Sequence, residues 1–444
     1  MKNPIHIKKR LSTAQIIICA FAAVILFGTL LLMLPISSAS GKFTPFSDAI
    51  FTSTSAVCVT GLIVHDTATY WSVFGQSVIL LLIQIGGMGV VTVAVAIAAF
   101  SGKKIGLSVR SLMQDSISAP KVGGIIKLTG FILKAVLIFE LCGALLLMPV
   151  FCGQFGLKGI WLSVFHSISA FCNAGFDLMG EVGEYSSLTS LSANPLLNTV
   201  IMLLIVIGGI GFLTWEDVVK HRHHISKYRL QSKVVIVVSA LLILLPALYF
   251  FFLEFSGYPL GERVAASMFT SVTTRTAGFN TVDFNTLTAG GRAIMIVLML
   301  IGGSPGSTAG GMKTTTVAVL FSSAIAVFRR KDSVKCFNRR LEDSAIKNAA
   351  AILLLYVTLF VGFAIVISAV EGIPLEKCLF ETASAIGTVG LSLGITPTLG
   401  LVSRALLIVL MFFGRVGGLT LIFAAVSTSK PNVSKLPQEK ITVG

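Results

Sequence analysis

One short pattern occurs four times along the chain, and each copy leads through polar residues into a single glycine. The copies close on Val59, Thr60 and Gly61; on Asn173, Ala174 and Gly175; on Thr276, Ala277 and Gly278; and on Thr388, Val389 and Gly390. A cation that leaves water needs replacement oxygens, and backbone carbonyls supply them without adding net charge. Glycine adopts the unusual backbone angles that turn successive carbonyls to one side at little steric cost. The four loops therefore predict a pore of fourfold pseudosymmetry that passes a dehydrated monovalent cation.

The composition indicates the kind of element that must position these loops. The chain has 444 residues, of which 55% are hydrophobic and 12% charged, and its mean hydropathy is +0.91. A soluble domain carries roughly twice that charged fraction. Apolar runs of about 20 residues recur, as membrane-spanning helices require. The fold class predicted is an all-α integral membrane protein.

The apolar runs divide the chain into four pseudo-repeats of outer helix, half-spanning pore helix, filter loop and inner helix. We expect the repeats at 13–100, 101–215, 216–328 and 329–427, with cytoplasmic tails at 1–12 and 428–444. The outer helices are expected at 13–35, 126–151, 234–254 and 348–370. The pore helices are expected at about 47–57, 160–171, 262–273 and 375–386. The inner helices are expected at about 73–100, 197–215, 291–328 and 402–427. This reading gives eight membrane-spanning helices around one central pore.

The third inner segment carries a stretch that cannot hold a regular helix. It consists of Gly302, Gly303, Ser304, Pro305, Gly306, Ser307, Thr308, Ala309, Gly310, Gly311, Met312 and Lys313. Five glycines and a proline in twelve residues predict two helical pieces joined by a polar loop at membrane depth. We interpret 302–313 as an intramembrane gate below the filter; the alternative is a static kink.

Three cationic side chains are interpreted separately: Arg415, Lys313 at the end of this stretch, and Arg275 in a filter loop. Arg415 stands where the other repeats have Gly87, Gly209 and Gly303, so it is expected to face the central axis. A cation in a membrane helix is costly and usually functional. Arg415 would repel ions or anchor the loop through its carbonyls, unless it is a structural arginine. Lys313 would add to this barrier or reach the cytoplasmic interface. Arg275, in the third filter loop, is expected to brace that loop from behind.

The net charge of +15 reflects topology. Most Lys and Arg lie in the two tails and in 101–125, 216–233 and 329–347, which the positive-inside rule places in the cytoplasm. Because topology accounts for the excess, no nucleic-acid partner is expected. The run 221–224, rich in histidine, is read as part of a basic loop rather than a metal site. No catalytic set of titratable residues repeats with the fourfold pattern, so an enzyme is not expected.

These features together resemble the Trk/Ktr/HKT superfamily of potassium transporters, most closely the KtrB-type bacterial membrane subunit, over about 13–427. The resemblance implies potassium uptake, with K⁺ bound at the four filter glycines, 302–313 as the gating loop and Arg415 as the constriction residue. It also implies a homodimer in the bacterial cell membrane and a cytosolic, KtrA-like ring of RCK domains. ATP or ADP would bind that ring, not this chain, which has no covalently bound cofactor. The ring would dock on 216–233 and 329–347.

The resemblance also bears on ion choice. Sodium stimulates uptake in many Ktr systems, and some plant relatives with Ser at the first filter glycine admit sodium. This chain has Gly61 at that position, which favours potassium. A less selective Na⁺/K⁺ transporter remains the alternative.

Overall fold

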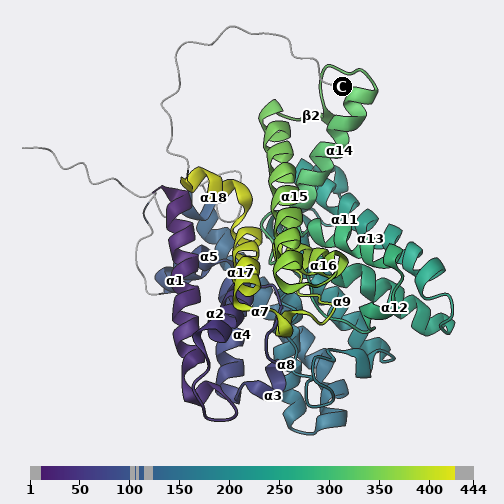
Figure 1. Ribbon diagram of the computed structural model, residues 1–444. Coiled ribbons are helices and arrows are strands. Elements are labelled where there is room, and N and C mark those ends of the chain that lie inside the picture. Colours follow the sequence, from purple (N-terminus) through teal and green to yellow (C-terminus); the bar gives the residue numbers. More distant parts are fainter. Residues whose placement is uncertain (1–11, 101–105, 107–109, 115–123, 426–444) are drawn as a thin grey trace, which may run out of the picture.

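The computed structural model describes residues 12–100, 106, 110–114 and 124–425. The predicted tails 1–12 and 428–444, apart from Ser12, and most of the basic segment 101–125 lie outside the described residues. The regular structure of the described part is helical except for one hairpin, β1 (Lys335–Cys336) with β2 (Arg339–Arg340), between α14 and α15. This hairpin projects from one end of the molecule, and the first filter loop leads into α3 (Thr67–Tyr70) near the other end (Figure 1).

Four outer helices are long and apolar enough to cross a membrane. They are α1 (Thr13–Met33), α7 (Ile125–Phe155), α11 (Leu230–Tyr249), which continues as the π-helical η4 (Phe250–Glu254), and α15 (Asp343–Glu371). Each packs against the pore helix of its own repeat. Many of their large apolar side chains remain exposed, as expected for a surface that meets lipid.

Four short helices follow the outer ones, close to the predicted positions. They are α2 (Phe46–Val57), α8 (Lys158–Phe171), α12 (Leu260–Thr273) and α16 (Leu375–Gly387). At 12 to 14 residues each, they are too short to cross a bilayer. Three of them begin directly after a proline, at Pro45, Pro259 and Pro374, where the missing N–H removes no intrahelical hydrogen bond.

The inner helices differ from the prediction, because all four are broken and not only the third. The first three pairs are α4 (Val73–Met88) with α5 (Val90–Phe100), α9 (Pro195–Ile210) with α10 (Phe212–His221), and α13 (Ala289–Leu300) with α14 (Thr314–Phe328); the fourth is α17 (Leu401–Val416) with α18 (Gly418–Ala425). A single glycine at positive φ makes the break in three repeats: Gly89 at +85°, Gly211 at +100° and Gly417 at +91°. The bend between α9 and α10 is 97°.

The continuous inner helices predicted at 73–100, 197–215 and 402–427 are therefore wrong. A positive φ lies outside the range of a right-handed helix, so one glycine suffices to turn the chain. Within the described residues the four outer helices qualify as spans, and the bent α9–α10 pair would be a fifth. The total of eight spans stays a prediction.

A second set of glycines explains how closely the inner helices approach the pore helices. A Cβ on Gly86, Gly208 or Gly414 would collide with a carbonyl oxygen in the last turn of a pore helix, that of Val57, Phe171 or Ile386 respectively. Small residues at these positions let the backbones touch. Three inner helices thereby lie against the C-terminal ends of the pore helices of their own repeats.

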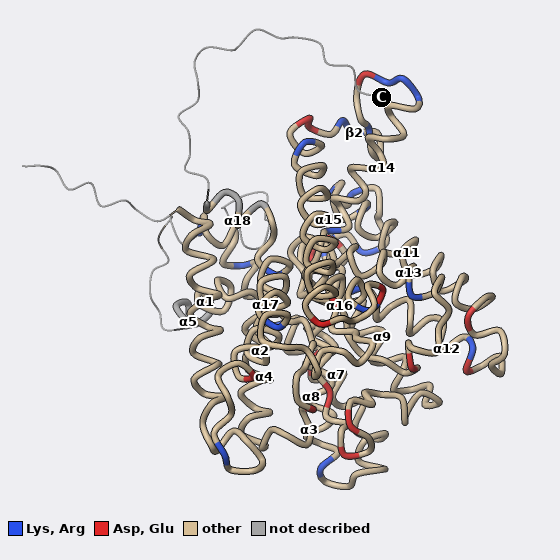
Figure 2. Tube along the Cα trace, in the orientation of Figure 1, with Lys and Arg blue, Asp and Glu red and all other residues tan. Residues whose placement is uncertain are grey.

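The two ends of the described chain meet at one end of the molecule. Gln15 Nε2 on α1 donates to the carbonyl oxygen of Ala424 on α18 at 3.2 Å. Lys and Arg, with some Asp and Glu, lie at the hairpin between α14 and α15, and both signs of charge appear at the end near α3 and α8 (Figure 2). The remaining short helices are 3-10 turns: η1 (Pro35–Ser37), η2 (Thr189–Leu191), η3 (Ile225–Lys227), η5 (Phe284–Thr286) and η6 (Thr396–Thr398).

Candidate ion pathway

All four filter loops share one backbone conformation. The glycines Gly61, Gly175, Gly278 and Gly390 have φ of +90°, +69°, +84° and +92°. Two residues earlier, Val59, Asn173, Thr276 and Thr388 also have positive φ, at +56°, +58°, +68° and +52°. A positive φ is unusual for any residue with a side chain, and for a β-branched one it is an outlier that costs about 1–3 kcal/mol. Left-handed residues that alternate with ordinary ones turn successive carbonyls toward the same side.

Each filter glycine lies against the backbone of the next loop, and the last loop closes on the first. A Cβ placed on Gly61 would lie 2.5 Å from the carbonyl oxygen of Ala174 in the second loop. In the same way, Gly175 meets the carbonyl of Ala277, Gly278 meets that of Val389, and Gly390 meets that of Thr60. The loops thus form a closed ring in chain order, with one carbonyl from each loop at the same level. No side chain fits at the four glycines without displacing backbone.

Hydroxyl groups at the ends of the pore helices hold the loops in place. Ser55 Oγ and Ser384 Oγ accept hydrogen bonds from the filter glycines Gly61 and Gly390, at 3.1 and 3.0 Å. In the other two loops the hydroxyl donates instead, from Ser169 to the Phe176 carbonyl and from Thr273 to the Phe279 carbonyl. Sequence reasoning missed these braces, although Ser55, Ser169 and Ser384 open three of the four motif copies.

Arg275 points away from the ring. Its side chain is buried, and Nη2 donates to Ser239 Oγ on α11 at 3.2 Å. Arg275 therefore contacts the outer helix of its own repeat, in agreement with the expected position behind the loop.

Lys134 and Glu140 lie in one outer helix, six residues apart, and the sequence predicts no ion pair between them. In the structure Lys134 is exposed, whereas Glu140 is buried and its carboxylate accepts a hydrogen bond from Gln84 Nε2 at 3.2 Å.

A cavity of about 400 Å³ opens on one side of the ring, and all four filter glycines line it. Asp177 and Asp283 also line this mouth. Burial raises the pKa of Asp177 to about 7, although the Met179 amide donates to its carboxylate at 3.0 Å; the nearby Asp66 carboxylate also raises it. The mouth therefore becomes more negative as the pH rises through 7.

The polar loop 302–313 lies on the opposite side of the ring and is mostly buried. Its amides pair with carbonyls at the breaks of two neighbouring inner helices: Ser304 N donates to Gly209 O at 3.0 Å, and Gly311 N donates to Gly414 O at 3.1 Å. In return, Phe212 N donates to Gly306 O at 2.7 Å. The backbone N–H and C=O groups of this loop have no partners within a regular helix. Several of them instead form hydrogen bonds with backbone groups near the glycine breaks of the neighbouring helices.

Arg415 reaches across the pathway to two other repeats. Nη1 donates to the Thr308 carbonyl of the loop, and Nη2 donates to the carbonyls of Gly86 and Gly87 on α4, the latter at 3.1 Å. Lys313 Nζ donates back to its own loop, to the Ala309 carbonyl at 2.8 Å. Both cations line a cavity of about 190 Å³ beyond the loop. Arg415 thus contacts the loop at the Thr308 carbonyl, and its expected roles stay predictions.

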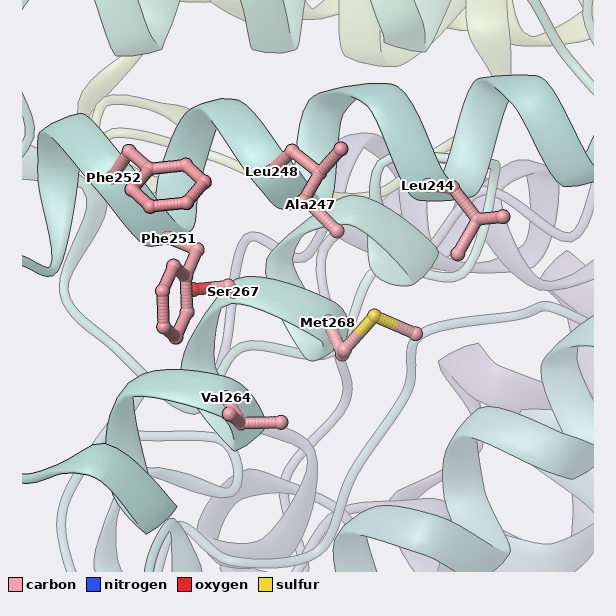
Figure 3. A pocket seen from close by; sticks show the side chains of 8 residues that line it. All are labelled: Leu244, Ala247, Leu248, Phe251, Phe252, Val264, Ser267 and Met268. Carbon is pink, nitrogen blue, oxygen red and sulfur yellow. The ribbon is translucent and has the colours of Figure 1, made fainter.

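Other candidate sites lie away from this pathway. In the described residues no three His, Cys, Asp or Glu side chains converge as a metal site would require, and this includes 221–224. A groove of about 370 Å³ on α11, η4 and α12 is lined by Leu244, Ala247, Leu248, Phe251, Phe252, Val264, Ser267 and Met268 (Figure 3). It carries no charged side chain, and none of the filter or loop residues lines it.

A ring of four backbone loops next to a buried polar loop, within a helical membrane protein, is the arrangement of an ion-transport pore. The chain matches the family model of the TrkH cation transport proteins over residues 4–436. It belongs to that family, a family of multi-pass membrane transporters and not of enzymes. This confirms the resemblance inferred from the motifs.

Individual relatives support the same assignment. The chain is 40% identical to the potassium/sodium uptake protein NtpJ of Enterococcus hirae, over 99% of both chains. It is 39% identical to the Ktr system potassium uptake protein B of Bacillus subtilis, over 98% of this chain and 97% of the relative. The crystal structure of the potassium transporter TrkH from Vibrio parahaemolyticus covers 96% of this chain and 87% of its own, at a TM-score of 0.74 and 19% identity. That likeness shows the helical fold.

Proposed function

We propose that this chain is the pore subunit of a potassium uptake system, in which K⁺ permeates as in a channel through the ring at Gly61, Gly175, Gly278 and Gly390. The observation that carries the proposal is the shared pair of left-handed residues in all four loops, which presents one carbonyl per loop at the same level. A ring of neutral carbonyls replaces the water of a large monovalent cation and offers little to a divalent one.

The gate in this proposal is the loop 302–313, held closed by Arg415. The loop is rich in glycine, fills the pathway below the ring and is hydrogen-bonded to two other inner helices, while Arg415 links it to α4 of the first repeat. Its role would be to open when those contacts are released. A cytosolic RCK-type ring that binds ATP or ADP would release them, and the exposed basic segments 216–233 and 329–347 are the surfaces proposed for docking. Similarity to a Ktr system subunit supports such a partner.

The same proposal includes a homodimer in the bacterial cell membrane, with both termini in the cytoplasm. Support for the orientation comes from the basic hairpin at the end opposite the filter mouth and from the contact between α1 and α18. A less selective Na⁺/K⁺ transporter is the second candidate, because one relative at 40% identity is named for both ions. Stimulation of uptake by Na⁺ would fit either candidate.

Uptake of ⁸⁶Rb⁺ into proteoliposomes that hold the purified chain tests the two candidates. A potassium pore should show Rb⁺ uptake that K⁺ blocks, Na⁺ blocks weakly and choline leaves unchanged. Equal block by Na⁺ and K⁺ would favour the second candidate. The assay should be run with and without a cytosolic RCK ring, and absence of uptake in folded protein under both conditions would contradict the proposal.

Asp177 predicts a pH dependence of this uptake. Its carboxyl has a pKa raised to about 7, so it is largely neutral at pH 6 and charged at pH 8. A negative charge at the mouth concentrates cations, so the KM for K⁺ should fall on the order of twofold to fivefold between these pH values. Asp177→Asn should abolish that dependence. An equally steep pH profile in the variant would assign the titration to another group.

A further inference from the structure

Thr308, in the middle of the gating loop, makes contacts through every one of its polar atoms. Its amide donates to Gly208 O at 3.2 Å, at the end of α9. Its hydroxyl donates to Phe171 O at 3.1 Å and accepts from Asn173 Nδ2 at 2.8 Å. Its carbonyl accepts from Arg415 Nη1. Thr308 is thus hydrogen-bonded to a pore helix, a filter loop and two inner helices.

The hydroxyl contacts are the ones that reach the filter. Phe171 is the last residue of pore helix α8, and Asn173 is the left-handed residue two places before Gly175. Both ends of the short turn into the second filter loop are therefore tied to one hydroxyl in the gating loop. Thr308 and Asn173 are fully buried, so water does not replace these bonds when they are lost.

Of the four residues at this position in the filter loops, Asn173 is the one whose side chain is hydrogen-bonded to the gating loop. The residues equivalent to Asn173 are Val59, Thr276 and Thr388. The side-chain oxygens of Thr276 and Thr388 are buried without a hydrogen-bond partner, and Val59 has no polar side-chain atom. The fourth loop touches the gating loop only through packing, where Gly310 leaves room for the Thr388 side chain.

We propose that Thr308 is a positioning residue for ion selectivity: its hydroxyl holds Asn173 and the end of α8, and so sets the position of the Ala174 carbonyl in the ring. The inference rests on the proposed function of the ring as a K⁺ filter. It adds that a residue of the gating loop takes part in discrimination between K⁺ and Na⁺, and not only in opening. Ring oxygens discriminate between two ions of different radius by their positions, so displacement of one loop changes the ratio and not only the rate.

The test compares three variants by the ratio of K⁺ to Na⁺ inhibition constants on ⁸⁶Rb⁺ uptake. Thr308→Val keeps the shape of the side chain and removes the hydroxyl. Thr308→Ser keeps the hydroxyl. Ser307→Ala is the matched control, because Ser307 Oγ donates only within the loop, to Ser304 O at 2.7 Å. The ratio in favour of K⁺ should fall on the order of threefold to tenfold in Thr308→Val, as expected for loss of buried hydrogen bonds. Thr308→Ser and Ser307→Ala should keep the wild-type ratio, whatever their rate.

The possible results separate this inference from the proposed function. Wild-type uptake that prefers K⁺, together with an unchanged ratio in Thr308→Val, would overturn the inference and leave Thr308 as a gate residue alone. Wild-type uptake without preference for K⁺ would overturn both the inference about Thr308 and the proposed function of the ring as a K⁺ filter. If Thr308→Val does not fold, Asn173→Leu removes the same bond from the filter side and should lower the ratio as well. An unchanged ratio in that variant would also overturn the inference.

Discussion

Arg415→Ala should raise ⁸⁶Rb⁺ uptake by about tenfold or more and make it less dependent on a regulatory ring. Arg415 donates to the loop at Thr308 and to α4 at Gly86 and Gly87. A charge-assisted hydrogen bond contributes about 1.5–3 kcal/mol, and 1.4 kcal/mol is a factor of ten in an equilibrium between closed and open states. Removal of these bonds shifts the equilibrium toward the open state, and removal of the positive charge lowers the electrostatic barrier to cations. Both effects favour permeation.

A second arginine on the same helix provides the control for Arg415→Ala. Arg404 of α17 donates to Asp48 Oδ1 at 2.8 Å and to the Pro397 carbonyl at 3.0 Å, and it does not touch the loop. Arg404→Ala should lower thermal stability without raising uptake. Unchanged flux in well-folded Arg415→Ala protein would leave Arg415 with a structural role and contradict its assignment to the gate.

Gly278→Ser should abolish most discrimination between K⁺ and Na⁺, by about tenfold or more in the ratio of their inhibition constants. The Cβ of the new side chain would lie 2.5 Å from the Val389 carbonyl oxygen, and the φ of +84° is strained for any residue with a side chain. The ring has no flexible side chain that could move aside. The third and fourth loops must therefore shift, which changes the positions of the ring oxygens.

Gly372→Ser is the matched control for strain alone. Gly372 ends α15 at a φ of +67°, and a Cβ there meets nothing within 4 Å. This variant should cost about 1 kcal/mol of stability at most and leave ion preference unchanged. Loss of selectivity in both variants would indicate a general loss of structure, and wild-type selectivity in Gly278→Ser would remove Gly278 from the filter.

The sequence predicts the outer helices, the pore helices and the filter loops closely, because each has a strong local signal. Long apolar runs identify the outer helices. The change from apolar to polar residues before each glycine marks the pore helices and their ends. The breaks at Gly89, Gly211 and Gly417 were missed because a lone glycine in an apolar run also fits a continuous membrane helix.

The partners of Arg415 and Thr308 could not be predicted from one sequence. Arg415 contacts Gly86 and Gly87, which belong to the first repeat, and Thr308 contacts Asn173 in the second. No local pattern records which repeats face one another across an axis. Pseudosymmetry predicts that Arg415 replaces a glycine near the axis, but the direction of its side chain depends on the three-dimensional packing of all four repeats.

The most direct test of the account is to locate the ion. Crystals of the protein grown in RbCl would be measured at the rubidium absorption edge, with crystals grown in NaCl as the comparison. We predict an anomalous peak on the axis of the ring formed by the carbonyls of Thr60, Ala174, Ala277 and Val389, and no peak there in NaCl. Rubidium bound elsewhere, with an empty ring at saturating RbCl, would contradict the assignment of the four loops as the selectivity filter.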